Sequence, residues 1–109
     1  MYRGTTPTLP IRIHGIDLTQ AKIFLSIWGE EEESTFTLTT PEDFTVDYDR
    51  ENDETSGEIT LTQEQTLALS AGSCQAQIRF VFPDGRAGAT PPSEIGVKDV
   101  FLKDVITYD

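Results

Sequence analysis

The chain of 109 residues has the length of one domain with a single hydrophobic core. Its 19 acidic residues exceed its 8 lysines and arginines, so the formal net charge of -11 at pH 7 repels phosphate backbones and anionic lipids. The composition therefore argues against nucleic acid and membrane as partners. The apolar runs also fall short of the roughly 20 residues that a membrane-spanning helix needs.

The N-terminal segment predicts an extended arm followed by a strand. Residues 1–7 are polar, and Pro7 disfavours a helix there. In residues 8–14 apolar side chains alternate with polar ones, which is typical of a strand with one buried face. Pro10 has no backbone N–H to donate, so it indicates that this strand lies at the edge of a sheet.

Residues 21–28 predict a second strand, with apolar side chains on both faces. Phe24 and Trp28 lie opposite a row of three aliphatic side chains on this strand. A second layer of the core covers the two aromatics, or they are left for a subunit contact or a sugar-stacking platform. Four glutamates at 30–33 then predict a charged loop beside the most apolar strand.

The middle of the chain predicts a short strand and a hairpin. Residues 34–39 alternate and end before Pro41. The apolar positions of 44–48 and of 59–61 recur with a period of two on either side of an acidic loop at 49–54. These two runs are expected to pair with each other.

A helical turn interrupts the strand pattern at residues 62–72. Thr62 has the position of an N-cap, with Gln65 three residues later as in a capping box. Leu67 and Ala68 fall at helical spacing, and Gly72 suits a C-terminal stop. One or two turns of helix are therefore expected here.

The last third of the chain predicts further strands. Residues 73–82 alternate most clearly, and a turn signal follows at 83–85. The small, proline-rich segment 86–93 is an edge strand or a loop, and apolar pairs between 95 and 106 close the domain. Seven or eight short strands with one short helical turn predict an all-β chain, an Ig-like antiparallel β-sandwich, with a small β-barrel as the alternative.

The acidic hairpin loop is the one candidate metal site in the sequence. Asp47, Asp49, Glu51 and Asp53 offer oxygen ligands at the alternate spacing that calcium loops use. The loop lacks the glycine at the sixth position and the bidentate acid at the twelfth, which excludes a helix-loop-helix calcium site. We therefore expect a solvated loop, with a weak calcium site as the minor alternative, and no other metal and no cofactor.

Catalytic equipment is sparse in the sequence. His14 has no second ligand or acid at a suitable local spacing and is expected to be a surface histidine at a strand end. Cys74 begins an inward-facing row, which predicts a buried, unreactive thiol. As the one cysteine it has no partner for an internal disulfide, which favours a reducing compartment. We therefore expect no catalytic residue and no enzyme activity.

Four short motifs carry a family resemblance along the whole chain. They are RGTTPT at 3–8, LTQEQTL at 61–67, QIR at 77–79 and LKDVI at 102–106. With these the chain resembles small phage and prophage proteins of Gram-positive bacteria. The resemblance implies a virion-associated β-sandwich whose role is usually unassigned and which has no catalytic residues. With no leader-like start after Met1, we expect no signal peptide, and residence in the host cytoplasm during assembly and then in the virion.

These observations favour a non-enzymatic virion structural or interaction protein. Its partners would be other protein subunits, either copies of itself or other virion components. Phe24, Trp28 and Phe101 are the candidate partner-binding residues, and residues 1–7 offer an extended arm. Two other classes stay open: an acidic host-directed inhibitor that mimics DNA, and a carbohydrate-binding module that uses Trp28.

Overall fold

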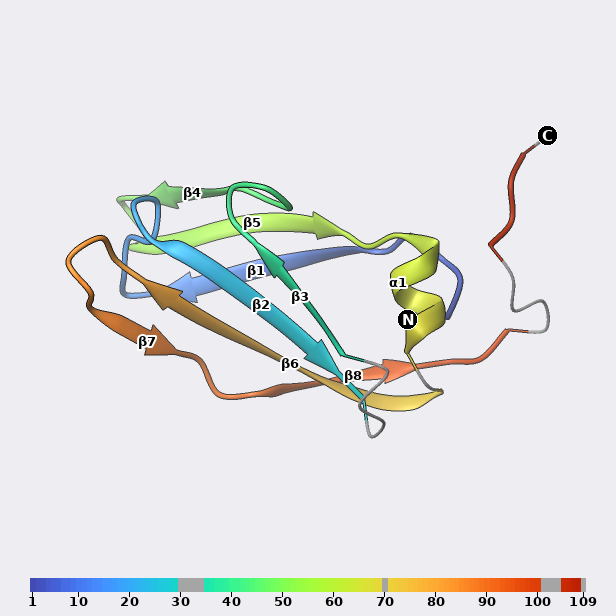
Figure 1. Ribbon diagram of the computed structural model, residues 1–109. Coiled ribbons are helices and arrows are strands. Elements are labelled where there is room, and N and C mark those ends of the chain that lie inside the picture. The colour runs from blue at the N-terminus through green and yellow to red at the C-terminus, as the bar shows by residue number, and fades with distance from the viewer. Residues whose placement is uncertain (30–34, 70, 101–104, 109) are drawn as a thin grey trace.

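A computed structural model describes residues 1–29, 35–69, 71–100 and 105–108. These parts of the chain form eight strands and one short helix (Figure 1). The elements are β1 (Thr8–His14), β2 (Lys22–Trp28), β3 (Phe36–Thr39), β4 (Val46–Asp49), β5 (Glu54–Thr60), α1 (Gln63–Ala68), β6 (Gly72–Val81), β7 (Ala87–Ala89) and β8 (Ser93–Val97).

The strands form two antiparallel sheets that lie face to face as two layers (Figure 1). One sheet has the order β1-β5-β4, and the other has the order β3-β2-β6-β7, with β8 also paired to β6. Among the described residues no strand of one sheet pairs with a strand of the other, so the sheets do not close into a barrel. The predicted all-β antiparallel sandwich is confirmed, and the barrel alternative is wrong.

Strands β7 and β8 follow one another along the same edge of β6. β8 pairs with residues 72–76 of β6 and β7 pairs with residues 79–81, whereas β2 pairs with the opposite edge. The interruption between them, residues 90–92, is Thr-Pro-Pro. The segment that the sequence left open as an edge strand or a loop is therefore both: a short edge strand followed by a proline break.

The core lies between the two sheets and follows the predicted alternation. Most of its members are aliphatic side chains on alternate positions of the strands, and the connections add three leucines and the ring of Phe44. The thiol of Cys74 is also part of it. Its members are Ile11, Ile13, Leu18, Ile23, Leu25, Ile27, Leu38, Phe44, Ile59, Leu61, Leu69, Cys74 and Val97. Burying such side chains contributes roughly 1.5–3 kcal/mol each, which is the main driving force for stacking the two sheets.

A buried hydroxyl fixes the loop between β1 and β2. Thr55 is fully buried, and its Oγ1 accepts a hydrogen bond from the Leu18 backbone N–H at 3.0 Å and donates to the Ile16 carbonyl at 2.7 Å. Both backbone groups would otherwise lie in the core without a partner. The side chain of Thr55 thus holds Leu18 inside the sandwich.

The helix begins where the sequence predicts and ends earlier. Thr62 caps it: the Gln65 N–H donates to Thr62 Oγ1 at 3.1 Å, and the Thr62 N–H donates to Gln65 Oε1 at 2.8 Å. It ends at Ala68 rather than near Gly72, because Gly72 already has a positive φ of 120° and pairs with Val97 as the first residue of β6.

The hairpin between β4 and β5 is tighter than the acidic loop that the sequence predicts. Asp49 pairs with Glu54, so only residues 50–53 form the connection. The last of them, Asp53, has a positive φ of 48°, a conformation that Asp tolerates better than most residues.

No helix in the described parts of the chain is long and apolar enough to cross a membrane.

Candidate functional site

A largely apolar opening lies along one side of the sandwich, and we call it the lateral groove. It lies between β1, an edge strand of one sheet, and β8 with the connection that precedes it, at an edge of the other sheet, and has a volume of about 520 Å³. Its walls are Leu9, Pro10, Ile11, Arg12, Ile13, Leu25, Ile27, Ala76, Ile78, Thr90, Pro91, Pro92, Ser93 and Ile95. The volume falls within the range of ordinary ligand pockets, and the walls include interior side chains of both sheets.

Prolines and one threonine shape the rim of this groove. Thr90 is fixed to β6, since its N–H donates to the Ile78 carbonyl at 2.8 Å and Gln77 Nε2 donates to the Thr90 carbonyl at 2.9 Å. Pro91 and Pro92 follow, and Pro10 lies on the opposite rim; none of the three has a backbone N–H. These prolines limit indiscriminate strand pairing at both edges while leaving the apolar walls open.

The N-terminal arm lies beside the end of β8, the strand that forms one edge of the lateral groove. Tyr2 forms a parallel bridge with Lys98 just beyond β8, and the Lys98 N–H donates to the Met1 carbonyl at 2.7 Å. Arg3 then joins two elements: its Nη1 lies 3.0 Å from Asp99 Oδ1 and its Nη2 donates to the Leu67 carbonyl at 2.7 Å. The arm that the sequence predicts is therefore docked on its own domain, between β8 and the start of β1.

The lateral groove has an uncharged interior and one cationic residue. Arg12 is the one charged side chain among the described residues that line it. Its side chain is 72% exposed and lies 3.7 Å from Glu54 at the rim. Although the chain has a net charge of -11, no carboxylate is among the described residues of this lining.

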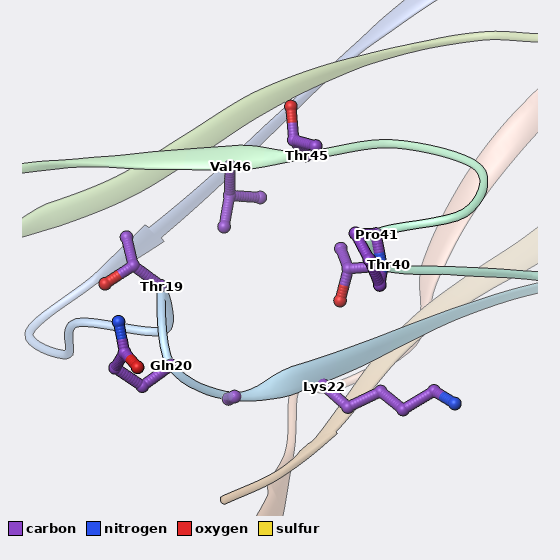
Figure 2. A pocket seen from close by; sticks show the side chains of 8 residues that line it. Thr19, Gln20, Lys22, Thr40, Pro41, Thr45 and Val46 are labelled. Atoms are coloured by element: carbon purple, nitrogen blue, oxygen red, sulfur yellow. The ribbon is translucent and has the colours of Figure 1, made fainter.

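A second cavity, of about 420 Å³, lies where the loop before β2 meets the connection between β3 and β4 (Figure 2). Val46 points into it from β4, whereas the Lys22 side chain extends away (Figure 2). Thr40 Oγ1 at its wall already accepts a hydrogen bond from the Ile23 N–H at 2.9 Å. Its wall holds no pair of groups suited to acid-base or nucleophilic chemistry.

Phe24 and Trp28 lie on the outer face of the larger sheet and not in the core. Both are half-buried, and their register neighbours on β6 are Arg79 and Gln75. The Lys22 ammonium lies 5.6 Å from the centre of the Phe24 ring. Coverage of these aromatics by a second core layer is not what the structure shows, and Phe101 lies outside the described residues.

The carboxylates of the acidic hairpin serve the turn itself. Asp49 accepts hydrogen bonds from the Asn52 side chain at 2.6 Å and from the Glu51 N–H at 3.0 Å, and bonds of this kind hold the pKa of Asp49 below its usual value. Asp53 accepts a hydrogen bond from the Tyr48 hydroxyl. In the described part of the chain no three acidic, His or Cys residues gather as a metal site, and the candidates Asp47 and Glu51 are exposed.

The two other candidate reactive groups lie apart from each other. The His14 side chain is 73% exposed at the end of β1, with its Nδ1 3.5 Å from Glu54. Cys74 is 2% exposed within the core, and burial raises the pKa of its thiol. A surface histidine and a buried thiol are what the sequence predicts for these positions.

The sequence predicts that apolar residues up to 106 close the domain, but Val105 and Ile106 lie in a short exposed tail. Val105, Ile106 and Tyr108 are 47%, 56% and 106% exposed, and with Tyr2 they are the exposed large hydrophobic residues of the described chain. The tail leaves the body beyond α1 (Figure 1). The groove was also not foreseen, because its walls read as ordinary core positions; the prolines on its rim were the available signal.

Comparison with known proteins gives little further information. No family model matches the chain, and no curated protein matches it. Among solved structures, it is similar to AggA, the major subunit of aggregative adherence fimbriae type I from Escherichia coli, with 13% identity and a TM-score of 0.41 over 89% of this chain and 84% of that chain. A similarity of this size does not carry function from one chain to the other.

Proposed function

We propose that this chain is a non-enzymatic subunit of a protein assembly. The observation that carries the proposal is the lateral groove, an apolar opening of about 520 Å³ into the core between two sheet edges. Apolar walls that stay in contact with water do not contribute the free energy of burial. A protein partner that covers them forms a complex stabilised by that burial. The same chain also exposes an apolar tail, which gives it two surfaces of the kind used in assembly.

The arrangement of reactive groups supports a role without catalysis. The exposed imidazole of His14 and the buried thiol of Cys74 do not form a nucleophile-base pair. In the hairpin, the carboxylates of Asp49 and Asp53 accept hydrogen bonds within their own turn. Both cavities are lined mainly by apolar and hydroxyl side chains, with one cationic residue each and the amide of Gln20 in the second. Binding is the chemistry that these surfaces offer.

The assembly that we propose is a phage or prophage virion. Its support is the resemblance of the motifs at 3–8, 61–67 and 77–79 to small phage proteins. The first of these motifs contains Arg3, which joins α1 to the end of β8, so the motif has a structural task in this fold.

Two measurements test the proposal. Light scattering over a range of protein and salt concentrations is expected to give masses above that of the monomer, and a strict monomer throughout would contradict self-assembly. Mass spectrometry of particles purified from a host that carries the gene is expected to find the chain in fixed stoichiometry. Its absence from washed particles would contradict the virion location.

A carbohydrate-binding module is the second candidate function. The outer face of the larger sheet presents two half-buried aromatic rings beside amide, guanidinium and hydroxyl groups, which is a suitable chemistry for stacking and hydrogen bonding to sugars. Saturable quenching or enhancement of Trp28 fluorescence by soluble glycans would support it. A silent glycan array would count against it. No observation in the described chain favours the DNA-mimic alternative.

A further inference from the structure

The exposed apolar tail is tethered to its own domain at Ile106. Gln63 Nε2 donates to the Ile106 carbonyl at 2.9 Å, and the Ile106 N–H donates to Gln63 Oε1 at 2.8 Å. This pair of bonds fixes the backbone of Ile106 beside the first residue of α1. Its side chain is still 56% exposed, and the segment then runs outward (Figure 1).

The open stretch of the lateral groove needs a short extended occupant. The N-terminal arm contacts the end of β8 and the residue after it, at Gly96 and Lys98, while the groove is walled by residues 9–13 on one side and by residues between 90 and 95 on the other. Four extended residues span about 13 Å, which is comparable to the length of β1 that lines the opening. Residues 105–108 have this length and no strand or helix of their own.

We propose that residues 105–108 of one copy bind in the lateral groove of a second copy of this chain. This inference rests on the proposed function as an assembly subunit and names the contact that joins the subunits. The side chains of Val105, Ile106 and Tyr108 supply the apolar surface, and the groove supplies the aliphatic walls. One contact of this kind buries both the tail and the groove walls and so removes both apolar surfaces from water.

Charge and rim chemistry support this occupant. The tail is flanked by Asp104 and Asp109 in the sequence, whereas Arg12 is the one charged residue of the described groove lining. An acid-flanked apolar segment therefore meets no carboxylate inside the groove. Because Pro10, Pro91 and Pro92 have no N–H, side-chain burial contributes more to this contact than strand pairing does.

The anchoring by Gln63 favours a second copy over the same chain. With Ile106 fixed beside α1, the tail points outward, toward a neighbour. A contact between a tail on one copy and a groove on the next uses two different surfaces, so it is heterologous. Repeated contacts of this kind produce a closed ring or an open filament.

A cross-linking experiment tests the contact directly. The Thr107→Cys protein, which keeps all three apolar tail residues, is mixed with the Ser93→Cys protein under mild oxidation. Ser93 is exposed at the groove rim, and the matched control is Thr19→Cys at the wall of the second cavity. Mixed disulfides are expected to form about tenfold faster with Ser93→Cys, because binding raises the local concentration of the two thiols.

Truncation after residue 104 separates this inference from the proposed function. Its mass by light scattering is expected to fall toward that of the monomer, with circular dichroism showing an unchanged fold. One outcome contradicts the tail contact alone: the full chain assembles, the truncated chain has the same assembly mass, and the two cysteine partners react at equal rates. In that case the assembly role stands. If the full chain is monomeric at all concentrations and no mixed disulfide forms, both proposals fail.

Discussion

The side-chain amide of Gln63 pairs with the backbone of Ile106 as a second strand would. Its Nε2 and Oε1 lie 2.9 and 2.8 Å from the Ile106 carbonyl oxygen and amide nitrogen. An amide side chain has one donor group and one acceptor, which matches the two groups that a peptide unit presents. Gln63 on α1 therefore holds the backbone of Ile106 beside the start of the helix.

Replacing Gln63 by Ala is expected to release the tail without unfolding the domain. Exposed hydrogen bonds contribute little net stability, so the free energy of unfolding should fall by less than about 1 kcal/mol. The Ile106 amide should lose its protection in hydrogen exchange measured by NMR. Gln63→Glu is the matched control, because it keeps the acceptor and removes the donor. Unchanged protection of Ile106 in the alanine variant would show that other contacts hold the tail.

Substitution of Gly88 by Ala is expected to destabilise the sandwich. Gly88 pairs with Phe80, and a Cβ built at Gly88 would lie 2.5 Å from Cζ of the Phe80 ring. The same ring packs edge-on against Phe82, with 5.9 Å between ring centres, so a shift of the ring away from the added methyl group disturbs this contact. We expect a loss of about 1–3 kcal/mol in urea unfolding, as for other overpacked sites.

Two variants identify the cause of that loss. Gly96→Ala lies on the same sheet edge, where a Cβ would meet nothing within 4 Å, and should change stability by no more than about 0.5 kcal/mol. Adding Phe80→Leu to Gly88→Ala should recover part of the loss by removing the ring edge. Equal losses in the two glycine variants would point to a backbone effect instead of a clash.

Much of this fold could be predicted from the alternation of residues. The alternating aliphatic residues of β2 and β6 placed Ile23, Leu25 and Cys74 in the core, and the capping box placed Thr62 at the start of α1. The period of two says which side chains share a face, but not which strands are neighbours. The order of the sheets, with β2 between β3 and β6, therefore came only from the structure.

The candidate site was less predictable for a related reason. Ile11 and Ile78 have the pattern of core residues, and nothing local in the sequence indicates that the two sheets leave an opening between them. Trp28 was ambiguous because an aromatic residue on the second face of a strand can face another layer or solvent. The helix of the predicted segment stopped early because pairing of Gly72 with Val97 outweighs a weak local helix propensity.

Cys74 is expected to resist alkylation in the folded protein. Its side chain is 2% exposed, and burial raises the pKa of the thiol, so thiolate is scarce near neutral pH. The Cys74 thiol ionises at a lower pH in the unfolded chain than in the folded protein. The free energy of unfolding should therefore be retained below the ordinary thiol pKa and fall as the pH rises beyond it. Modification by iodoacetamide should proceed at the rate of unfolding. The control is Ser73→Cys, one residue away and exposed, which should react at once.

Trp28→Ala is expected to leave the domain folded. Trp28 is half-buried on the outer face of β2, outside the core cluster, whereas its neighbour Ile27 is fully buried. Truncating Trp28 should cost about 1 kcal/mol, and truncating Ile27 should cost about 2–5 kcal/mol because it leaves a cavity. Thermal unfolding followed by circular dichroism compares the two on the same strand. Equal losses of stability in the two variants would place Trp28 under a covering layer and would rule out the outer face as a binding surface. A small loss of stability together with a changed assembly mass or glycan response would assign Trp28 to a partner contact.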